Sequence, residues 1–422
     1  MIVIVGAGLA GLACATELLR QGRPFLLLDA ADVPGGRLRT SIRDGFTLDH
    51  GFQVVLSSYS AVSKVVDIAT LQPRYFESGA LLAHEGRFAH LANPLRHPLA
   101  LFENLTSPVF SFRDKFLLST LVTRVTMSSD ASLLSRCKST KDLSTRDFLQ
   151  QFGFSPFFLS RFAEPFFGGV LLDGDLGTSA GLFLYYLKKF TTGRAWLPAS
   201  GIAAIPTQMA FRLPAGSLRL RTRVMALDVK NHRACGVTLE NGEHIAASSI
   251  VLALAEPTVC QLLERPAPER ARSVAVVYFK SRQSIYPNPC LVLPESGSGL
   301  VRHFAQVTNV APEFAPRGFH LITASVLDFS DLSDESLAHA VKMEIAAIFP
   351  NASASLEYLE TIHVSYAVPS QPPGFANRKP FADLPDGIYA AGDWMGGASI
   401  QSAISSGLDS AHSILNHSTL YP

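Results

Sequence analysis

The sequence predicts an α/β protein in which a Rossmann-like nucleotide-binding domain is interrupted by a second, mixed α+β lobe. Three observations predict it. The first thirty residues read as strand, glycine turn, helix and strand, further buried strands follow near the middle of the chain, and a strand, turn and helix close it. The length of 422 residues exceeds what one hydrophobic core usually supports, so a second lobe is expected.

The first unit is sharply marked. Ile2–Val5 is a short β-branched run that ends at a glycine, which is typical of a buried parallel strand. Leu9–Gln21 predicts a helix that Gly22 ends, and Phe25–Leu28 predicts a second strand.

From about Tyr59 the pattern becomes helical and rich in aromatic residues, which are numerous enough to line an apolar pocket as well as to fill a core. This indicates a separate lobe. The expected helices are Tyr59–Ala69, Phe112–Met127, Thr145–Gln151, Pro156–Phe167 and Leu176–Phe190.

Strands return near Leu218, with a hairpin signal at Asn241-Gly242 and a buried run at Ser248–Leu254. After a second excursion, with one amphipathic helix near 335–348, the chain closes with a strand and a helix from about Ser399 to Asn416. We therefore expect residues 1–58, 195–256 and 371–422 to form the nucleotide-binding domain, and residues 59–194 and 257–370 to form the other lobe.

Composition excludes several classes of protein. The chain is 47% hydrophobic and 17% charged with a formal net charge of +1, so no global field favours nucleic acid. No run of 18 apolar residues predicts a membrane span, and the glycines of the first dozen residues argue against a signal peptide. The five cysteines lack a CxxC pair or a metal-ligand spacing, so we expect a cytoplasmic protein without disulfides or metal: Cys14, Cys137, Cys235, Cys260 and Cys290.

The stretch Gly6–Gly11 is a GxGxxG motif between a strand and a helix. Its first glycine allows a tight turn, the second lets the backbone approach a pyrophosphate, and the third lets helix and strand pack. Asp29 lies 29 − 11 = 18 residues beyond the last glycine, where a carboxylate accepts hydrogen bonds from ribose hydroxyls. The competing interpretation is a glycine-rich turn followed by a surface aspartate.

The motif alone does not separate FAD from NAD. Gly35-Gly36-Arg37 follows directly, and its approachable backbone and guanidinium fork suit a second contact with the pyrophosphate. The alternative is a turn that carries a solvated arginine.

Residues 1–53, with the Gly35-Gly36-Arg37 segment and the stretch Leu48–Gln53, resemble the amino end of the flavin amine oxidase superfamily, which includes monoamine oxidases, protoporphyrinogen oxidases and phytoene desaturases. Gly387–Asp393 and Ser399–Gly407 resemble its closing strand and helix. The segments around Val224 and from Trp196 to Pro206 resemble its middle, although Ser200 replaces a glycine. The resemblance implies a GR2-type flavoprotein with FAD as cofactor.

The resemblance also implies roles for single residues. Asp393 would contact the ribityl or pyrophosphate part of FAD, backbone groups at Val224 would bind the adenine, and the helix that begins near Ser399 would face the pyrimidine edge of the ring. A helix dipole there stabilises negative charge on the reduced ring. The expected cofactor-binding residues are Gly6, Gly8, Leu9, Ala10, Gly11, Asp29, Ala30, Gly36, Arg37, Gly51, Phe52, Gln53, Val224, Gly392, Asp393, Ile400, Gln401 and Ala403.

Val368-Pro369 and Gln371–Gly374 resemble the porphyrinogen-oxidase and desaturase branches. The resemblance therefore implies hydride abstraction from a largely apolar small molecule. The alternatives are a flavin amine oxidase and, from another class, a redox-neutral or non-catalytic flavoprotein.

No catalytic residue beyond the flavin is identified from the sequence. Lys280 either corresponds to the lysine near the flavin of amine oxidases or is solvated at a strand end. Trp394 either covers the flavin or packs in the core. The helical part of Leu91–Met127, which carries several basic residues, either packs in the lobe or rests on a membrane surface.

Overall fold

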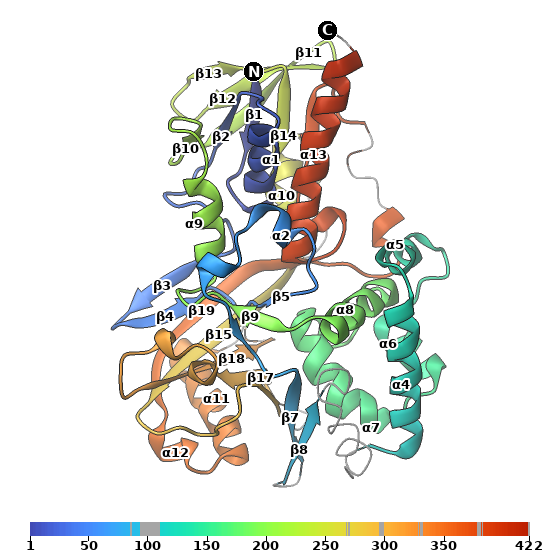
Figure 1. Cartoon of the computed structure of the whole chain (residues 1–422), viewed down its shortest axis with the longest axis vertical. Helices are drawn as coiled ribbons and strands as arrows, with labels where there is room; N and C mark the ends of the chain where they lie inside the picture. Colours follow the sequence, from blue (N-terminus) through green and yellow to red (C-terminus); the bar gives the residue numbers. More distant parts are fainter. Residues whose placement is uncertain are drawn as a thin grey trace.

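The computed structural model shows two lobes joined along a long axis (Figure 1). The described residues are 1–84, 87–92, 110–266, 268, 271–294, 299–327, 329, 332–377, 381 and 383–420. The strand-rich nucleotide lobe lies at one end, and the second lobe, with a sheet beside a group of helices, lies at the other.

A five-stranded parallel sheet forms the centre of the first lobe, in the order β10-β2-β1-β14-β20. Two of its strands, β1 and β2, are fully buried apolar runs, as expected where both faces of a parallel sheet are covered. The strands are β1 (Ile2–Val5), β2 (Phe25–Leu28), β10 (Leu218–Arg219), β14 (Ser249–Leu252) and β20 (Ile388–Ala390).

One face of this sheet is covered by α1 (Leu9–Arg20) and α13 (Ile400–Leu420), which lie side by side in Figure 1. Their backbones are close, because a Cβ at Gly407 would lie 2.0 Å from the carbonyl oxygen of Ala10. The chain's two ends are therefore packed together in one core, to which α9 (Ala204–Phe211) also contributes.

The opposite face packs against an antiparallel three-stranded sheet and a short helix, α10 (Glu256–Leu262). The expected Asn-Gly turn joins the second and third strands of this sheet. The strands are β11 (Val224–Lys230), β12 (Arg233–Leu239) and β13 (His244–Ala246).

The second lobe contains a seven-stranded mixed sheet in the order β19-β15-β18-β17-β16-β7-β8. One of its faces packs against α11 (Asp334–Ile348) and α12 (Ala352–Ser355). The strands are β7 (Gly79–His84), β8 (Arg87–Ala92), β15 (Ala271–Ser281), β16 (Leu291–Leu293), β17 (Val301–Gln306), β18 (His320–Val326) and β19 (Glu357–Pro369).

A helical group completes this lobe around an aromatic core in which Phe154, Phe158 and Phe162 follow one another at 4.3–5.5 Å between ring centroids. Its helices are α4 (Phe112–Met127), α5 (Asp130–Ser135), α6 (Thr145–Phe152), α7 (Pro156–Phe158) and α8 (Ala180–Thr192). The remaining elements, which join the lobes, are α2 (Val62–Val65), β3 (Thr40–Arg43), β4 (Phe46–Asp49), β5 (Val55–Leu56), β6 (Arg74–Tyr75), β9 (Ala195–Leu197) and short 3-10 turns.

The strands of the two large sheets come from different segments of the chain. Every strand of the five-stranded sheet lies in 1–58, 195–256 or 371–422, and every strand of the seven-stranded sheet lies in 59–194 or 257–370. We retain that discontinuous two-domain division as a proposal.

Two helix predictions are wrong in detail. The expected helix Tyr59–Ala69 is reduced to the four residues of α2, because Val66 is already extended (φ −119°, ψ 134°) and a separate 3-10 turn follows. The expected helix Pro156–Phe167 is α-helical only over α7 and continues as a π-helix, Leu159–Gly168, that contains Pro165. Proline has no N–H for the usual α-helical hydrogen bond, and a wider turn accommodates it.

The predicted helix Phe112–Met127 forms as α4, and its Phe112 and Phe116 are 79% and 70% exposed. Residues 93–109 of the segment considered for membrane contact lie outside the described residues. Among the described helices, none is both long and apolar enough to cross a bilayer.

Asp49 is a buried acid at the end of β4. It is hydrogen bonded to β3 and to the segment before α9. Its Oδ1 accepts hydrogen bonds from Thr40 Oγ1 (2.6 Å) and from the backbone N–H of Ile202 (2.9 Å). Burial raises the pKa of Asp49 to about 6, and these hydrogen bonds only partly oppose the rise.

Asp49→Asn therefore should stabilise the protein in a pH-dependent way. The native state holds the Asp49 proton more tightly than the unfolded chain does, so wild-type stability falls as pH rises from about 4 to about 6. The variant keeps the acceptor oxygen without the charge, so its free energy of unfolding should exceed that of wild type by about 3 kcal/mol above pH 7 and match it near pH 4. Denaturant titrations across this range measure the difference, with Asp409→Asn, at an exposed position on α13, as the control. A difference independent of pH would contradict the assignment.

Candidate dinucleotide and substrate cavity

The carboxyl ends of four parallel strands open into one cavity of about 1380 Å³. Gly6 follows β1, Asp29 follows β2, Ala253 follows β14 and Gly392 lies just beyond β20, and all four line the cavity. The order of the sheet reverses between β1 and β14, and ligands of open α/β sheets bind in the crevice at such a switch point.

The glycines of the first turn have different constraints. Gly6 has φ +105°, and a Cβ at Gly11 would lie 1.9 Å from the carbonyl oxygen of Gly6, so both are required by the local packing. At Gly8, by contrast, no described atom lies within 4 Å of the position that a Cβ would take. No described side chain caps the start of α1, so its first N–H groups face this open space as an anion-binding end.

The Asp29 carboxylate holds the turn in place. Its two oxygens accept hydrogen bonds from the backbone N–H groups of Ala7 (2.6 Å) and Ala31 (2.7 Å), and the residue also lines the cavity. Asp29 therefore is not a free surface acid. Its carboxylate holds the glycine turn, and the residue is also placed to contact a ligand in the cavity.

The second glycine pair lies against the first turn. The N–H of Gly35 donates to the carbonyl oxygen of Ala7 (2.8 Å), and a Cβ at Gly36 would lie 3.3 Å from Cα of Gly8. The two glycine loops thus form one backbone surface at the cavity wall.

Arg37 joins the two ends of the chain. Its NH2 donates to Oδ1 of Asp393 at 2.5 Å, and its NH1 donates to the carbonyl oxygen of Ala367 at 2.8 Å. Burial lowers the pKa of Arg37, but the charge and hydrogen bond of Asp393 outweigh it and raise the pKa above its usual value. The alternative of a merely solvated arginine is wrong, because the guanidinium is paired inside the cavity wall.

The carboxyl-terminal side of the cavity is formed by the turn after β20 and the start of α13. Ser399 Oγ accepts a hydrogen bond from the N–H of Ser402 (3.2 Å), and Ala398, Ser399 and Ile400 line the cavity. Trp394 packs in the core, where its Nε1 donates to the carbonyl oxygen of Leu254 (3.1 Å).

The side-chain oxygen of Gln53 provides independent evidence for a bound molecule, because it lacks a hydrogen-bond partner among the described residues. The Nε2 of the same residue donates to the carbonyl oxygens of Arg37 and His50, both at 3.3 Å, whereas its Oε1 is buried without such a partner. Because buried acceptors are normally satisfied, this oxygen in the cavity wall fits a donor on a bound molecule. With the open Gly8 and the two helix ends, the residues fit an extended dinucleotide.

Most of the residues expected at the cofactor share this cavity, and three do not. Gly11 lies behind the turn, Arg223 lines the cavity in place of Val224, and Gln401 turns away so that its Oε1 accepts from the N–H of Ala61 (2.8 Å). The fifteen that line it are Gly6, Gly8, Leu9, Ala10, Asp29, Ala30, Gly36, Arg37, Gly51, Phe52, Gln53, Gly392, Asp393, Ile400 and Ala403. Their roles at the cofactor are our proposal.

Sequence reasoning missed the wall formed by Ala253–Ala255. The signal was present, because Ser248–Leu254 predicts a buried parallel strand whose carboxyl end must meet those of β1 and β2. It also missed His303 and Val274, which line the same cavity from the seven-stranded sheet.

Beyond the glycine loops the cavity continues into the second lobe, where aromatic side chains from the π-helix and α8 line it. Lys280 lies elsewhere. Its Nζ is 3.5 Å from Oε2 of Glu357, and it is not among the residues that line the cavity. The aromatic residues of this part include Phe158 at the end of α7, together with Phe162, Phe166, Phe167, Tyr186 and Phe190.

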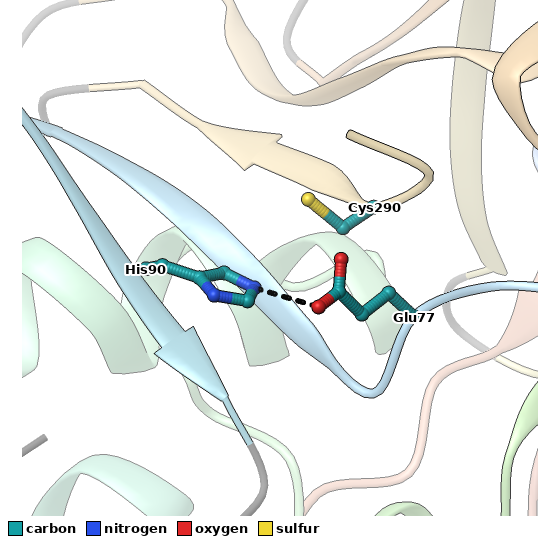
Figure 2. Close-up of side chains that lie close together, drawn as sticks. All are labelled: Glu77, His90 and Cys290. Atoms are coloured by element: carbon teal, nitrogen blue, oxygen red, sulfur yellow. Dashed lines mark ion pairs between the residues drawn. The ribbon is translucent and has the colours of Figure 1, made fainter. Parts of the chain in front are cut away.

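One group of possible metal ligands occurs within the described residues: Glu77, His90 and Cys290, of which only Glu77 lines the cavity (Figure 2). His90 Nε2 lies 3.7 Å from Oε1 of Glu77. Burial, helped by the Glu77 charge, raises the pKa of Cys290 to about 12, whereas a metal requires a thiolate. We assign the group to packing within the second lobe, and the expectation of no metal stays a prediction.

Together the sheet, the glycine loops and the far-end acid define a class: an α/β protein that holds a redox dinucleotide at the carboxyl edge of its sheet. Comparison with known proteins identifies the family. The model of flavin containing amine oxidoreductases matches residues 9–415, so the chain belongs to that family. The protein is an FAD-dependent oxidoreductase.

Individual relatives agree. A phytoene dehydrogenase of Streptomyces griseus is 26% identical over 366 residues, covering 76% of this chain and 71% of the relative. A structure from Exiguobacterium sp. 255-15, assigned as a protoporphyrinogen oxidase, has a TM-score of 0.73 at 19% identity over 99% of this chain and 98% of the other. A putrescine oxidase variant has a TM-score of 0.74 at 18% identity over 98% of each chain. The two structures show the same fold.

Substituting two glycines of one motif separates cofactor binding from folding. Gly8→Ala places a methyl group in open space, so the apoprotein should unfold near the wild-type temperature while FAD affinity falls tenfold or more. Gly11→Ala drives a methyl group into the carbonyl of Gly6 and should lower stability itself. Flavin fluorescence titration and thermal unfolding of both apoproteins measure this. Equal FAD affinity in wild type and Gly8→Ala would contradict the proposal that the pyrophosphate lies against the backbone at Gly8.

Arg37→Leu tests the link between the chain ends. It leaves the Asp393 carboxylate, 4% exposed, without its cation, which should cost about 3 kcal/mol of unfolding free energy. The double variant Arg37→Leu, Asp393→Asn should recover at least half of this loss. Arg74→Leu, which breaks the more exposed pair with Glu313, is the control and should change stability little. Similar losses in the two single variants would show that the Arg37 pair has no special role.

Proposed function

We propose that the enzyme abstracts a hydride from a largely apolar small molecule, in the manner of a desaturase or a porphyrinogen oxidase. The observation that carries the proposal is the second-lobe part of the cavity, where a wall of phenylalanines and aliphatic side chains continues from the expected flavin site around Phe52. Bound FAD supplies the hydride acceptor. The chain's own residues bind the substrate, exclude water and orient the carbon that loses hydride.

The charged residues of this part are poorly suited to hold an amine. The Asp114 carboxylate already accepts hydrogen bonds from Ser111 Oγ (2.6 Å), Ser155 Oγ (2.7 Å) and the N–H of Ser155 (2.9 Å). Glu77 lies beside His90. Among the described residues that line this part of the cavity, both carboxylates therefore have neighbouring partners, which favours an uncharged substrate over an amine.

The segment that resembles the porphyrinogen-oxidase and desaturase branches also supports the proposal. Gln371 reaches from this segment to the start of α13, where its Oε1 accepts from the N–H of Ala398 (2.8 Å). Its carbonyl oxygen accepts from the N–H of Ser179 before α8 (2.9 Å). The segment thus connects the start of α13 with the aromatic side of the cavity. The name of the phytoene dehydrogenase relative indicates that its substrate is phytoene, an apolar molecule.

Anaerobic mixing of the FAD-loaded protein with candidate substrates tests the proposal. Phytoene or a porphyrinogen, dispersed in detergent, should bleach the visible flavin absorbance, and putrescine or benzylamine should not. Bleaching by the amines alone would establish the amine oxidase alternative. Bleaching by neither class, with turnover only when the flavin is first reduced, would establish the redox-neutral alternative.

A charge placed in the aromatic wall supplies a variant for the same assay. Phe166→Asp should slow flavin bleaching by the apolar substrate more than tenfold with FAD content unchanged, because a carboxylate there is costly to desolvate. Phe211→Asp, at a position 89% exposed on α9, is the matched control and should react like wild type. An unchanged rate in Phe166→Asp would place the substrate elsewhere.

A further inference from the structure

His303, at the centre of β17, is a polar group in the cavity wall whose hydrogen bonds are unmade. The residue is 5% exposed and lines the cavity. Neither of its ring nitrogens has a hydrogen-bond partner among the described residues. Buried polar groups are normally hydrogen bonded, so we expect a partner for the imidazole beyond the described residues.

The position of the ring is fixed by its neighbours. A Cβ at Gly169 would lie 2.3 Å from His303 Nδ1, so only glycine leaves room for the imidazole there. On another side the ring of Phe52 lies with its centroid 5.3 Å away. Ser325, which pairs with His303 in the register of β17 and β18, is also buried and lines the cavity. Two polar residues therefore lie side by side in one small area of the cavity wall.

The chemistry of this area selects an uncharged partner. Burial lowers the pKa of His303 to about 4, so the ring is neutral at physiological pH and offers one N–H donor and one acceptor nitrogen. A buried acid of the loop that follows the π-helix, Asp173, already accepts a hydrogen bond from Thr178 Oγ1 (2.8 Å) and is paired with Arg272 (3.0 Å). A hydroxyl matches a neutral ring as donor or acceptor, and a keto oxygen matches its N–H.

We propose that His303 and Ser325 form a polar subsite that binds a hydroxyl or keto oxygen on the otherwise apolar substrate. The inference deepens the proposed function and rests on it. It narrows the substrate from any apolar molecule to one that carries an uncharged oxygen, and it gives His303 a binding and orienting role beside the aromatic wall.

Binding of a matched pair of probes to the FAD-loaded enzyme tests the subsite without requiring turnover. The probes are geranylgeraniol and the corresponding C20 hydrocarbon without the hydroxyl, titrated in the same detergent and followed by the change in flavin absorbance. Wild type should bind the alcohol roughly three- to tenfold more tightly than the hydrocarbon. His303→Phe should abolish that preference and leave hydrocarbon affinity unchanged. His303→Gln, which can still donate and accept, should keep part of it.

Two further variants control the interpretation. Gly169→Ala keeps the imidazole but displaces it, so it should also reduce the preference. His363→Phe removes a histidine of the same lobe that is 42% exposed, paired with Asp334 and absent from the cavity wall, so it should behave like wild type.

The failures are distinguishable. Equal binding of both probes to wild type, or a preference that survives in His303→Phe, overturns the subsite and leaves the proposed function standing. Loss of FAD from His303→Phe, with stability unchanged, overturns it by placing the ring at the cofactor. Failure of wild type with normal FAD content to bind either probe contradicts the apolar cavity, and the proposed function and the subsite fall together.

Discussion

The ion pair between Arg37 and Asp393 is the contact on which the rest of the cavity depends. The two residues are 356 positions apart, and the guanidinium also reaches the carbonyl oxygen of Ala367 on β19. One side chain therefore fixes the second glycine loop, the turn after β20 and the end of a strand from the other lobe. Because the carboxylate is buried, the pair persists only where all three segments have assembled.

Because these three segments meet at one ion pair, the cavity at the edge of the parallel sheet has two different ends. The carboxyl ends of β1, β2, β14 and β20 supply one end of the cavity, where unfilled space at Gly8 faces the start of α1. The other end lies between the start of α13 and the aromatic wall. In the proposed arrangement the sheet determines where the dinucleotide binds, and the second lobe determines which molecule meets its redox ring.

Three features were predictable from the sequence because their backbone requirements are local: the first glycine motif, the second glycine pair and the closing turn. Gly6, for example, needs its positive φ for the turn itself, whatever the distant segments do. Side-chain directions were not, since they depend on packing between distant segments. Gln401 was expected at the cofactor but bonds to Ala61, and Lys280 bonds across to Glu357. His303 carries no local signal, because its isolation in the wall arises only when β17 meets Gly169 and Phe52.

The most direct test of the central claim, that both chain ends hold one dinucleotide, is a crystal structure of the protein with FAD bound. We expect the pyrophosphate to lie against the glycine loops at Gly8 and Gly36, and the flavin ring to lie between Gln53 and Ser399 with one face open to the aromatic wall. A flavin bound with its phosphates away from the start of α1, or with Asp393 far from any part of the cofactor, would contradict it.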